Sequence, residues 1–310
     1  MHLLRQSISQ FDNGKETDEA VRAAEDDLTR AAIAEQVSSG LDLVTDGQVR
    51  WHDPISHLAG QLENVSLNGL QRFFDTNFYL RQPVVDGPVV WLRPVLRPEF
   101  EMASRESSKP VKQVLTGAYT LARHSIVEYV PYQKDFAQLV LDYNEAVAKE
   151  VSQLAEAGAS VIQIDEPSIL KEPAHADWDL LEKTLIRLSA AKGKARLVLA
   201  TYFGDATPVL HHLLSMPADV VALDFTCNPR LADQVAAAKP AKPLGLGLLD
   251  GRNPELEDPA TVLAMLESLL PKIRATECYL NPSSGLEYLP RDRALAKLKL
   301  LVGIRNRINS

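Results

Sequence analysis

The sequence predicts an α/β protein of the (β/α)8 TIM-barrel type, organised as one domain over residues 1–310. Short apolar runs alternate with amphipathic segments along most of the chain, which is typical of parallel strands connected by helices. Seven such runs end in polar residues, and residues 3–9 would make an eighth at the front. A chain of 310 residues also suits a single barrel.

The expected strands follow one another in the order that eight β/α units require. They cover residues 3–9, 42–47, 112–120, 160–167, 196–205, 219–226, 243–253 and 277–285. Apolar positions at three- and four-residue spacing indicate helices between most of them. These helices cover residues 16–39, 132–157, 258–272 and 290–307. The first two stop at Gly40 and Gly158, and a glycine just past the last turn is a common helix end.

Residues 51–111 interrupt this alternation. The apolar runs "NFYL" (77–80) and "PVVW" (88–91) flank Asp86 and Gly87. An Asp-Gly pair between such runs is typical of a β-hairpin turn. The sequence therefore predicts a hairpin inserted after the second strand, in a position to cover one end of the barrel.

The composition argues against several classes of protein. The net charge is −8 and no run is rich in lysine or arginine, so the electrostatic footprint of a nucleic-acid binder is missing. No stretch approaches the roughly 18 apolar residues of a membrane span, and the first residues lack the apolar core of a signal peptide. Cys227 and Cys278 give no disulfide framework. We therefore expect a cytoplasmic protein that acts on a small-molecule substrate.

Barrels of this class place their active sites at the carboxyl ends of the strands, which we call the mouth. Polar residues, several of them acids, are expected there. The set is Asp46, Gln48, Thr116, Tyr119, Asp165, Glu166, Tyr202, Asp205, Asp224, Asp250, Arg252, Asn253 and Ser284. The candidates for acid–base catalysis are Asp165, Tyr202, Asp205 and Asp224. The remaining residues, with Asp165, are candidates for substrate binding.

Asp165 and Glu166 are adjacent carboxylates at the end of the buried run "VIQID" (161–165). Charges in such a place are costly unless something pairs with them. A single acid at a strand end more often caps the next helix or pairs with an arginine. Several acids that converge on one mouth favour a ligand amine, another cationic group or a metal.

Sequence motifs give little support for a metal site or a nucleophile. His124, Asp224 and Cys227 could come together, but no zinc-binding spacing links them. The chain contains no G-x-S-x-G motif. The run "LGLGLLDGRN" (244–253) lacks the third glycine of a dinucleotide-binding loop, so a buried strand explains it better. No metal ligands are therefore assigned.

Six motifs together resemble cobalamin-independent methionine synthase, from about Leu3 to the end of the chain. In order they are "LDLVTDGQVR", "VLTGAYT", "VIQIDEPSIL", "LATYFGD", "LGLGLLDGRN" and "YLNPSSGLEYLPRD". The resemblance implies a (β/α)8 barrel that moves a methyl group from methyltetrahydrofolate to homocysteine. In that family the thiolate of homocysteine is bound to zinc, which makes the thiol a nucleophile at neutral pH.

The resemblance also assigns roles to single residues. Asp165 matches the aspartate that holds the amino group of homocysteine. Gln48 replaces a family acid that contacts the same amine, although Asp46 remains. Lys171 falls where the family has a glutamate near the folate site.

The zinc ligands of the family are mostly absent. The histidine and cysteine of one pair fall at Ala200 and Tyr202, and another cysteine falls at Ser284. Asp224 aligns with the glutamate ligand. Alanine cannot ligate a metal, and tyrosine does not readily replace a thiolate. The runs "TYFGD", "DGRN" and "GLEYLPRD" resemble instead the zinc-less N-terminal half of the two-barrel enzyme.

Three hypotheses follow. The first is a methyltransferase that binds an amine at Asp165 and methyltetrahydrofolate, or a similar donor, between the mouth and the hairpin. In it Tyr202, Asp205 and Asp224 would replace the metal as acid–base groups. The second is a non-catalytic auxiliary barrel that binds folate or an amino acid and partners a separate catalytic subunit. The third is a lyase or hydrolase, for which Lys171 suggests a Schiff base.

Overall fold

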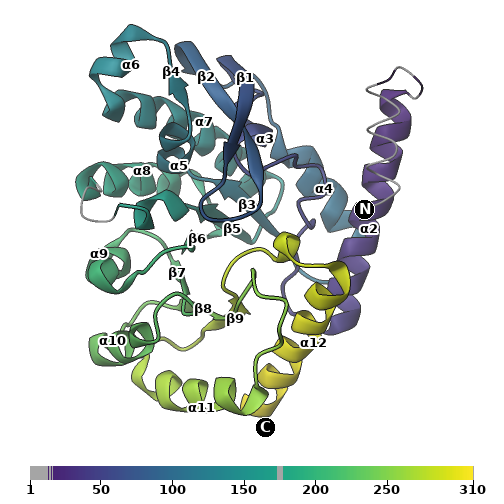
Figure 1. Cartoon of the computed structure of the whole chain (residues 1–310), viewed down its shortest axis with the longest axis vertical. Coiled ribbons are helices and arrows are strands. Elements are labelled where there is room, and N and C mark those ends of the chain that lie inside the picture. The colour runs from purple at the N-terminus through teal and green to yellow at the C-terminus, as the bar shows by residue number, and fades with distance from the viewer. Residues whose placement is uncertain (1–12, 14, 16, 173–176, 310) are drawn as a thin grey trace.

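The computed structural model describes residues 13, 15, 17–172 and 177–309 (Figure 1). Its centre is a curled sheet of six parallel strands in the order β3, β5, β6, β7, β8, β9. The strands are β3 (Lys112–Thr116), β5 (Val161–Asp165), β6 (Arg196–Thr201), β7 (Val220–Asp224), β8 (Leu244–Leu249) and β9 (Tyr279–Pro282). All six were expected from the sequence.

The first two expected strands have different outcomes. The segment 42–47 contributes one parallel bridge, from Val44 to Val111, which places it beside β3. The segment 3–9 lies outside the described residues.

Helices lie on the outside of the curled sheet (Figure 1). The longer ones are α2 (Asp18–Ser39), α4 (Leu96–Glu106), α7 (Phe136–Glu156), α8 (Trp178–Ala191), α10 (Arg230–Ala238), α11 (Pro259–Leu269) and α12 (Arg291–Ile308). Short ones are α3 (Ser56–Ala59), α5 (Ala118–Arg123), α6 (Val130–Lys134) and α9 (Leu210–Ser215). Single 3-10 turns are η1 (Pro167–Leu170), η3 (Thr207–Val209), η4 (Leu270–Lys272) and η5 (Leu286–Tyr288).

Two of the expected helices have a different form. The segment 132–157 is divided at Asp135, whose carboxylate accepts the N–H of Gln138 and caps α7. The segment 258–272 passes from α11 into η4. The expected end of α2 is confirmed, since Gly40 has a φ of 92°, a left-handed conformation that favours glycine.

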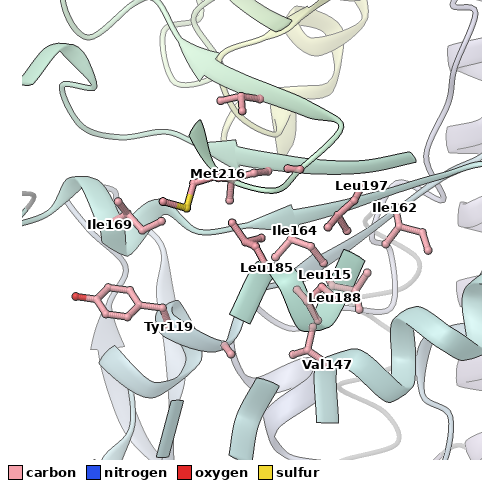
Figure 2. Close-up of a cluster of buried hydrophobic side chains, with 14 of the residues drawn as sticks. Leu115, Tyr119, Val147, Ile162, Ile164, Ile169, Leu185, Leu188, Leu197 and Met216 are labelled. Atoms are coloured by element: carbon pink, nitrogen blue, oxygen red, sulfur yellow. The ribbon is translucent and has the colours of Figure 1, made fainter. Parts of the chain in front are cut away.

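The two faces of the sheet have different partners. Outward side chains such as Ile162, Ile164 and Leu197 pack with Leu185 and Leu188 of α8 (Figure 2). Inward side chains form a separate cluster of Val161, Val198, Ala200, Val220 and Ala222. Because paired residues of neighbouring parallel strands share a face, the pairings Gln163–Val198 and Asp165–Ala200 place Gln163 and Asp165 on the inward face.

The predicted hairpin is present, but the prediction of its turn at Asp86 and Gly87 is wrong. Strand β1 (Glu63–Arg72) pairs antiparallel with β2 (Tyr79–Val90), and residues 73–78 form the turn. Thr76 closes that turn, because its hydroxyl donates to the carbonyl of Phe73 and accepts the N–H of Phe78. Asp86 and Gly87 lie within β2 instead, where the register shifts. They occupy a β-bulge, which also favours glycine. A short strand, β4 (Ile126–Val127), pairs with β2 on its other side.

Glu166 connects β5 to the start of α5. Its two carboxylate oxygens accept the N–H of Tyr119 at 3.0 Å, the N–H of Thr120 at 2.8 Å and the hydroxyl of Thr120 at 2.6 Å. A Cβ on Gly117 would lie 2.1 Å from the same carboxylate, so only glycine fits before α5. Burial raises the pKa of Glu166 to about 7, and the bonds to Thr120 and Tyr119 oppose that rise. The sequence predicts Glu166 at the substrate, but its carboxylate here stabilises the connection between β5 and the start of α5.

Within residues 17–172 and 177–309, no helix combines the length and apolar character that crossing a membrane requires.

Replacing Glu166 by alanine tests its role in the fold. We expect Glu166→Ala to lower the free energy of unfolding by roughly 2–4 kcal/mol, because three buried donors lose their acceptor. Urea denaturation followed by circular dichroism measures the change. The matched control is Glu172→Ala, which removes an exposed ion pair with Arg123 and should cost less than about 0.5 kcal/mol. Equal losses in both variants would contradict the capping role.

Candidate active site

The carboxylate of Asp165 stands at the carboxyl end of β5 and faces into the barrel. The side-chain amide of Gln163 donates to Oδ1 at 2.7 Å, and the hydroxyl of Tyr202 donates to Oδ2 at 3.1 Å. Both direct donors are neutral. Burial raises the pKa of Asp165 to about 6, although the bond from Gln163, the charge of Lys112 and the bond from Tyr202 lower it. Asp165 therefore changes charge just below neutral pH.

Glu287 and Tyr288 approach Asp165 from η5, after the last strand. Solvent reaches the Glu287 side chain, yet the surrounding protein raises its pKa to about 7, the charge of Asp165 adds to the rise, and a backbone hydrogen bond opposes it. Burial and the neighbouring Glu287 raise the pKa of the Tyr288 hydroxyl. Sequence reasoning missed both residues. The signal was their position, directly after a strand end in the run "GLEYLPRD".

The hairpin turn packs over these groups through aromatic side chains. Phe74 lies edge-on to Phe203 with ring centroids 5.7 Å apart, and Phe73 contacts the same ring at 6.2 Å. Phe78 lies edge-on to Tyr288 at 5.8 Å. Phe203 in turn contacts Tyr288 at 5.5 Å. The turn of the hairpin thus covers the side of the mouth that holds Asp165.

Asp224 is buried, and its carboxylate is used by the chain around it. Oδ1 accepts the N–H and hydroxyl of Thr226 at 2.9 and 2.6 Å. Oδ2 accepts the N–H of Phe203 at 3.3 Å and the thiol of Cys227 at 3.2 Å. Burial and the charge of Asp224 raise the pKa of Cys227 to about 12, so its thiol stays protonated. Asp224 therefore holds the loop at Phe203, which has a left-handed φ of 64°.

Asp205 is also engaged locally. It accepts the N–H of Thr207 at 2.9 Å and the side-chain amide of Asn228 at 2.7 Å. Burial alone would raise its pKa, but these hydrogen bonds outweigh it and lower the pKa. Asp205 thus stays ionised at neutral pH, which does not suit a group that must hold a proton.

The loop after β8 contributes one residue that contacts the aromatic cover. The guanidinium of Arg252 lies 4.7 Å from the centre of the Phe203 ring. The neighbouring candidates bond within their own loops. Asp250 accepts the N–H of Arg252, Asn253 accepts the N–H of Glu255, and the Ser284 hydroxyl donates to the carbonyl of Gly285 at 3.4 Å.

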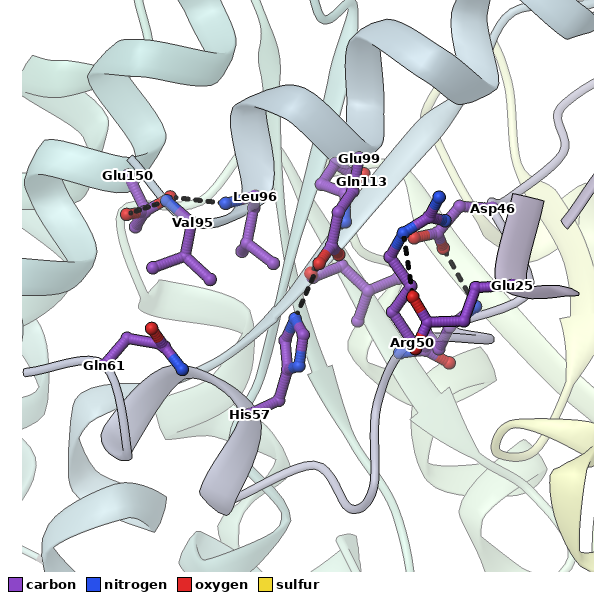
Figure 3. Close-up of polar contacts among 12 residues, drawn as sticks. Glu25, Asp46, Arg50, His57, Gln61, Val95, Leu96, Glu99, Gln113 and Glu150 are labelled. Carbon is purple, nitrogen blue, oxygen red and sulfur yellow. Dashed lines mark hydrogen bonds and ion pairs between the residues drawn. The ribbon is translucent and has the colours of Figure 1, made fainter. Parts of the chain in front are cut away.

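Asp46 belongs to a different polar cluster. It accepts the N–H of Gln48 at 3.0 Å, and its charged neighbours are Glu99, His57 and Arg50 (Figure 3). Burial and the charge of Glu99 raise the pKa of Asp46 to about 6. None of the contacts described for Asp46 and Gln48 involves a group that surrounds Asp165.

Thr116 and Tyr119, the candidates after β3, make packing contacts. The Thr116 hydroxyl donates to the carbonyl of Pro54, which attaches the start of the inserted segment to β3. The Tyr119 ring lies edge-on to Phe136 with centroids 6.1 Å apart.

The side chains at the expected zinc positions do not fit that metal. Ala200 and Tyr202 stand where a histidine and a cysteine would be needed, and Ser284 replaces a thiolate. Asp224 remains, but its oxygens already accept four donors. In the part of the chain that the structure describes, no three side chains of histidine, cysteine, aspartate or glutamate are grouped to hold a metal ion.

Comparison with known proteins places these residues in a family context. Residues 3–306 match the family model described as the catalytic domain of cobalamin-independent synthase. The chain is 29% identical over 300 residues to a methionine synthase of Sulfurisphaera tokodaii, covering 96% of this chain and 86% of the relative. It is 30% identical over 302 residues to a methionine synthase of Saccharolobus solfataricus, covering 96% and 89%.

A solved structure shows the same fold. The B12-independent methionine synthase from Shewanella sp. W3-18-1, in complex with selenomethionine, superposes with a TM-score of 0.80 at 19% identity. The match covers 95% of this chain and 90% of that chain. It confirms the predicted barrel fold.

Truncating Phe74 tests the attachment of the hairpin to the mouth. We expect Phe74→Ala to lower the local opening free energy of the turn 73–78 by roughly 1–3 kcal/mol, because the contacts with Phe203 and His124 are lost. Amide hydrogen exchange of the hairpin measures this change. The control is Leu70→Ala, since Leu70 is 72% exposed on the same hairpin. Unchanged protection in Phe74→Ala would show that other contacts hold the turn.

Proposed function

Because the chain belongs to the family of cobalamin-independent synthases, we propose that it transfers a methyl group to the thiol of a small amino acid, with homocysteine as the acceptor. The family membership rests on the match over residues 3–306. The groups at the mouth support the choice of acceptor and donor.

The observation that carries the proposal is the environment of Asp165. Two hydrogen-bond donors stabilise the ionised form of its carboxylate. Among the contacts described for Asp165, no cation touches this carboxylate directly. A ligand ammonium would supply that cation through a charge-assisted hydrogen bond. The Shewanella structure contains selenomethionine, an amino acid that carries such an ammonium group.

A methyl donor would bind on the hairpin side of the same mouth. Phe74 and Phe203 supply aromatic faces, and Arg252 supplies a positive charge above one of them. A flat heteroaromatic donor with an anionic tail, such as methyltetrahydrofolate, suits that combination. This placement would bring its methyl group toward a thiol that is anchored by its amine at Asp165.

Proton transfer at this mouth would fall to Glu287. A pKa of about 7 suits a general base at neutral pH. Glu287 would take the proton of the acceptor thiol, and the thiolate sulfur would then attack the methyl carbon. As the new S–C bond forms, the N–C bond of the donor breaks and its electron pair returns to nitrogen. That nitrogen would then take up the proton that Glu287 removed from the thiol, which restores the Glu287 carboxylate. Tyr202 would orient Asp165 rather than exchange protons, because burial and Asp165 raise the pKa of Tyr202 well above its ordinary value.

The alternative of an auxiliary barrel receives no support from the comparisons. The chain covers 86% and 89% of two relatives that are named methionine synthase. Those relatives are therefore close to the length of one barrel. Lys171 likewise gives no support for a lyase, since it lies exposed directly after η1.

Removing the charge of Asp165 tests the amine site. L-methionine is the product that methyl transfer to homocysteine would form. We expect Asp165→Asn to weaken the binding of L-methionine about 100-fold at pH 7. Binding to the wild type should also weaken about tenfold per pH unit below pH 6, because the ammonium binds only the ionised carboxylate. Isothermal titration calorimetry from pH 5 to 8 measures both effects. The exposed Asp233→Asn is the charge-matched control. Equal affinity in Asp165→Asn and the wild type would exclude this site.

Removing the basic group of Glu287 tests the proton step. We expect Glu287→Gln to reduce kcat for methyl transfer from methyltetrahydrofolate to L-homocysteine about 100-fold. The rise of activity with pH near 7 should disappear in this variant. The affinity of this variant for L-methionine should stay within twofold of the wild-type affinity. The control variant Glu255→Gln, at an exposed position, should show the same affinity within that range. A variant that keeps the pH profile of the wild type would assign the proton step to another group.

A further inference from the structure

A lysine lies inside the barrel, below the mouth. Lys112 begins β3 and pairs with Val161, while Val114 pairs with Gln163, so their side chains share the inward face of the sheet. The Lys112 ammonium donates to the side-chain oxygen of Gln163 at 2.5 Å. The amide nitrogen of Gln163 donates in turn to Asp165 at 2.7 Å. These contacts form a continuous chain from the start of β3 to the mouth.

We propose that Lys112 is a positioning residue that fixes the amide of Gln163 with its N–H groups toward Asp165, and so keeps that carboxylate ready for a ligand ammonium. The proposal rests on the proposed function for the identity of the ligand group only. The orientation of the amide and its effect on Asp165 are properties of the free protein.

The orientation follows from the donors and acceptors at the two ends of the amide. An ammonium has only N–H donors and an ionised carboxylate has only acceptors. With the amide as observed, its oxygen meets the ammonium and its nitrogen meets the carboxylate. Turning the amide over would set donor against donor and acceptor against acceptor. The charges at both ends therefore select one of the two orientations.

Lys112 lies beside the inward apolar cluster. It pairs with Val161 of that cluster, and its side chain is partly exposed. Burial lowers the pKa of Lys112, while the charge of Asp165 opposes that shift. Because methionine could fill the same place without the cost of partly desolvating a charge, the bond to Gln163 explains the ammonium better than packing does.

Several titratable groups face Asp165, and Lys112 is the cation among those that act on it. Tyr202 approaches from the residue directly after β6, and Glu287 and Tyr288 approach from η5. Glu166 follows Asp165 in the chain, and the charge of Asp165 acts on it. The charge of Asp165 raises the pKa of both Glu287 and Glu166, whereas the charge of Lys112 lowers the pKa of Asp165. Removing Lys112 should therefore shift the titration of Asp165 toward higher pH.

The test compares Lys112→Met with the wild type in two measurements. The first follows the side-chain carboxyl of Asp165 in ligand-free protein by carbon-13 NMR, with the resonance identified by its loss in Asp165→Asn. We expect the midpoint to rise by about one pH unit in Lys112→Met. The second measures L-methionine binding by calorimetry between pH 5 and 8.5, and affinity at pH 6 should fall about fivefold. Binding of 4-(methylthio)butanoate, which lacks the amine, should change less than twofold.

Two further variants keep the result decisive. Gln163→Met breaks the same chain in its middle and should shift Asp165 in the same direction, so it carries the test if Lys112→Met does not fold. Lys149→Met removes a lysine that contacts Trp91 on the outside of the barrel and should change neither measurement. An unchanged Asp165 midpoint in the folded variants would overturn the positioning role. A shifted midpoint without L-methionine binding in the wild type would support that role and overturn the proposed amine site.

Discussion

The carboxylate of Asp165 is the group on which the rest of the mouth depends. It ends a buried strand, and its two oxygens accept one bond from its own strand and one from Tyr202, which directly follows the neighbouring strand β6. Gln163 is itself held by Lys112 from β3. Side chains from three adjacent strands are therefore arranged around one charge, and the hairpin covers that charge with aromatic rings. In the proposed function, a ligand ammonium would supply the cation that the direct contacts of Asp165 lack.

The adjacent acids Asp165 and Glu166 have different surroundings because of strand geometry. Successive side chains of a strand point to opposite faces. Asp165 faces the barrel interior, and Glu166 turns to the first backbone N–H groups of α5. In the proposed function the Asp165 carboxylate is left for a ligand, while the Glu166 carboxylate attaches β5 to the helix after β3. Asp165 would then be a binding group that lies beside a structural group.

Much of the fold could be predicted from the sequence, because apolar alternation and helix ends are local signals. The six strands from Lys112 onward and the end of α2 at Gly40 are examples. The position of the hairpin turn could not be predicted, because Asp86 and Gly87 suit a bulge as well as a turn.

The sequence predicts Asp205 and Asp224 as acid–base groups, yet the backbone N–H groups two residues later donate hydrogen bonds to their carboxylates. That local bonding is common for aspartate before a turn and could have been anticipated. The contacts that run from Lys112 through Gln163 to Asp165 could not be predicted from the sequence, since they depend on the register between β3 and β5.

A crystal structure with bound L-homocysteine would test the central claim most directly. The account predicts the ligand nitrogen within hydrogen-bond distance of Asp165, with the amide nitrogen of Gln163 still on Oδ1 and the ligand sulfur directed toward Glu287. A ligand nitrogen bound elsewhere, for example among Asp46, Glu99 and His57, would contradict it and would move the active site to the other side of β3.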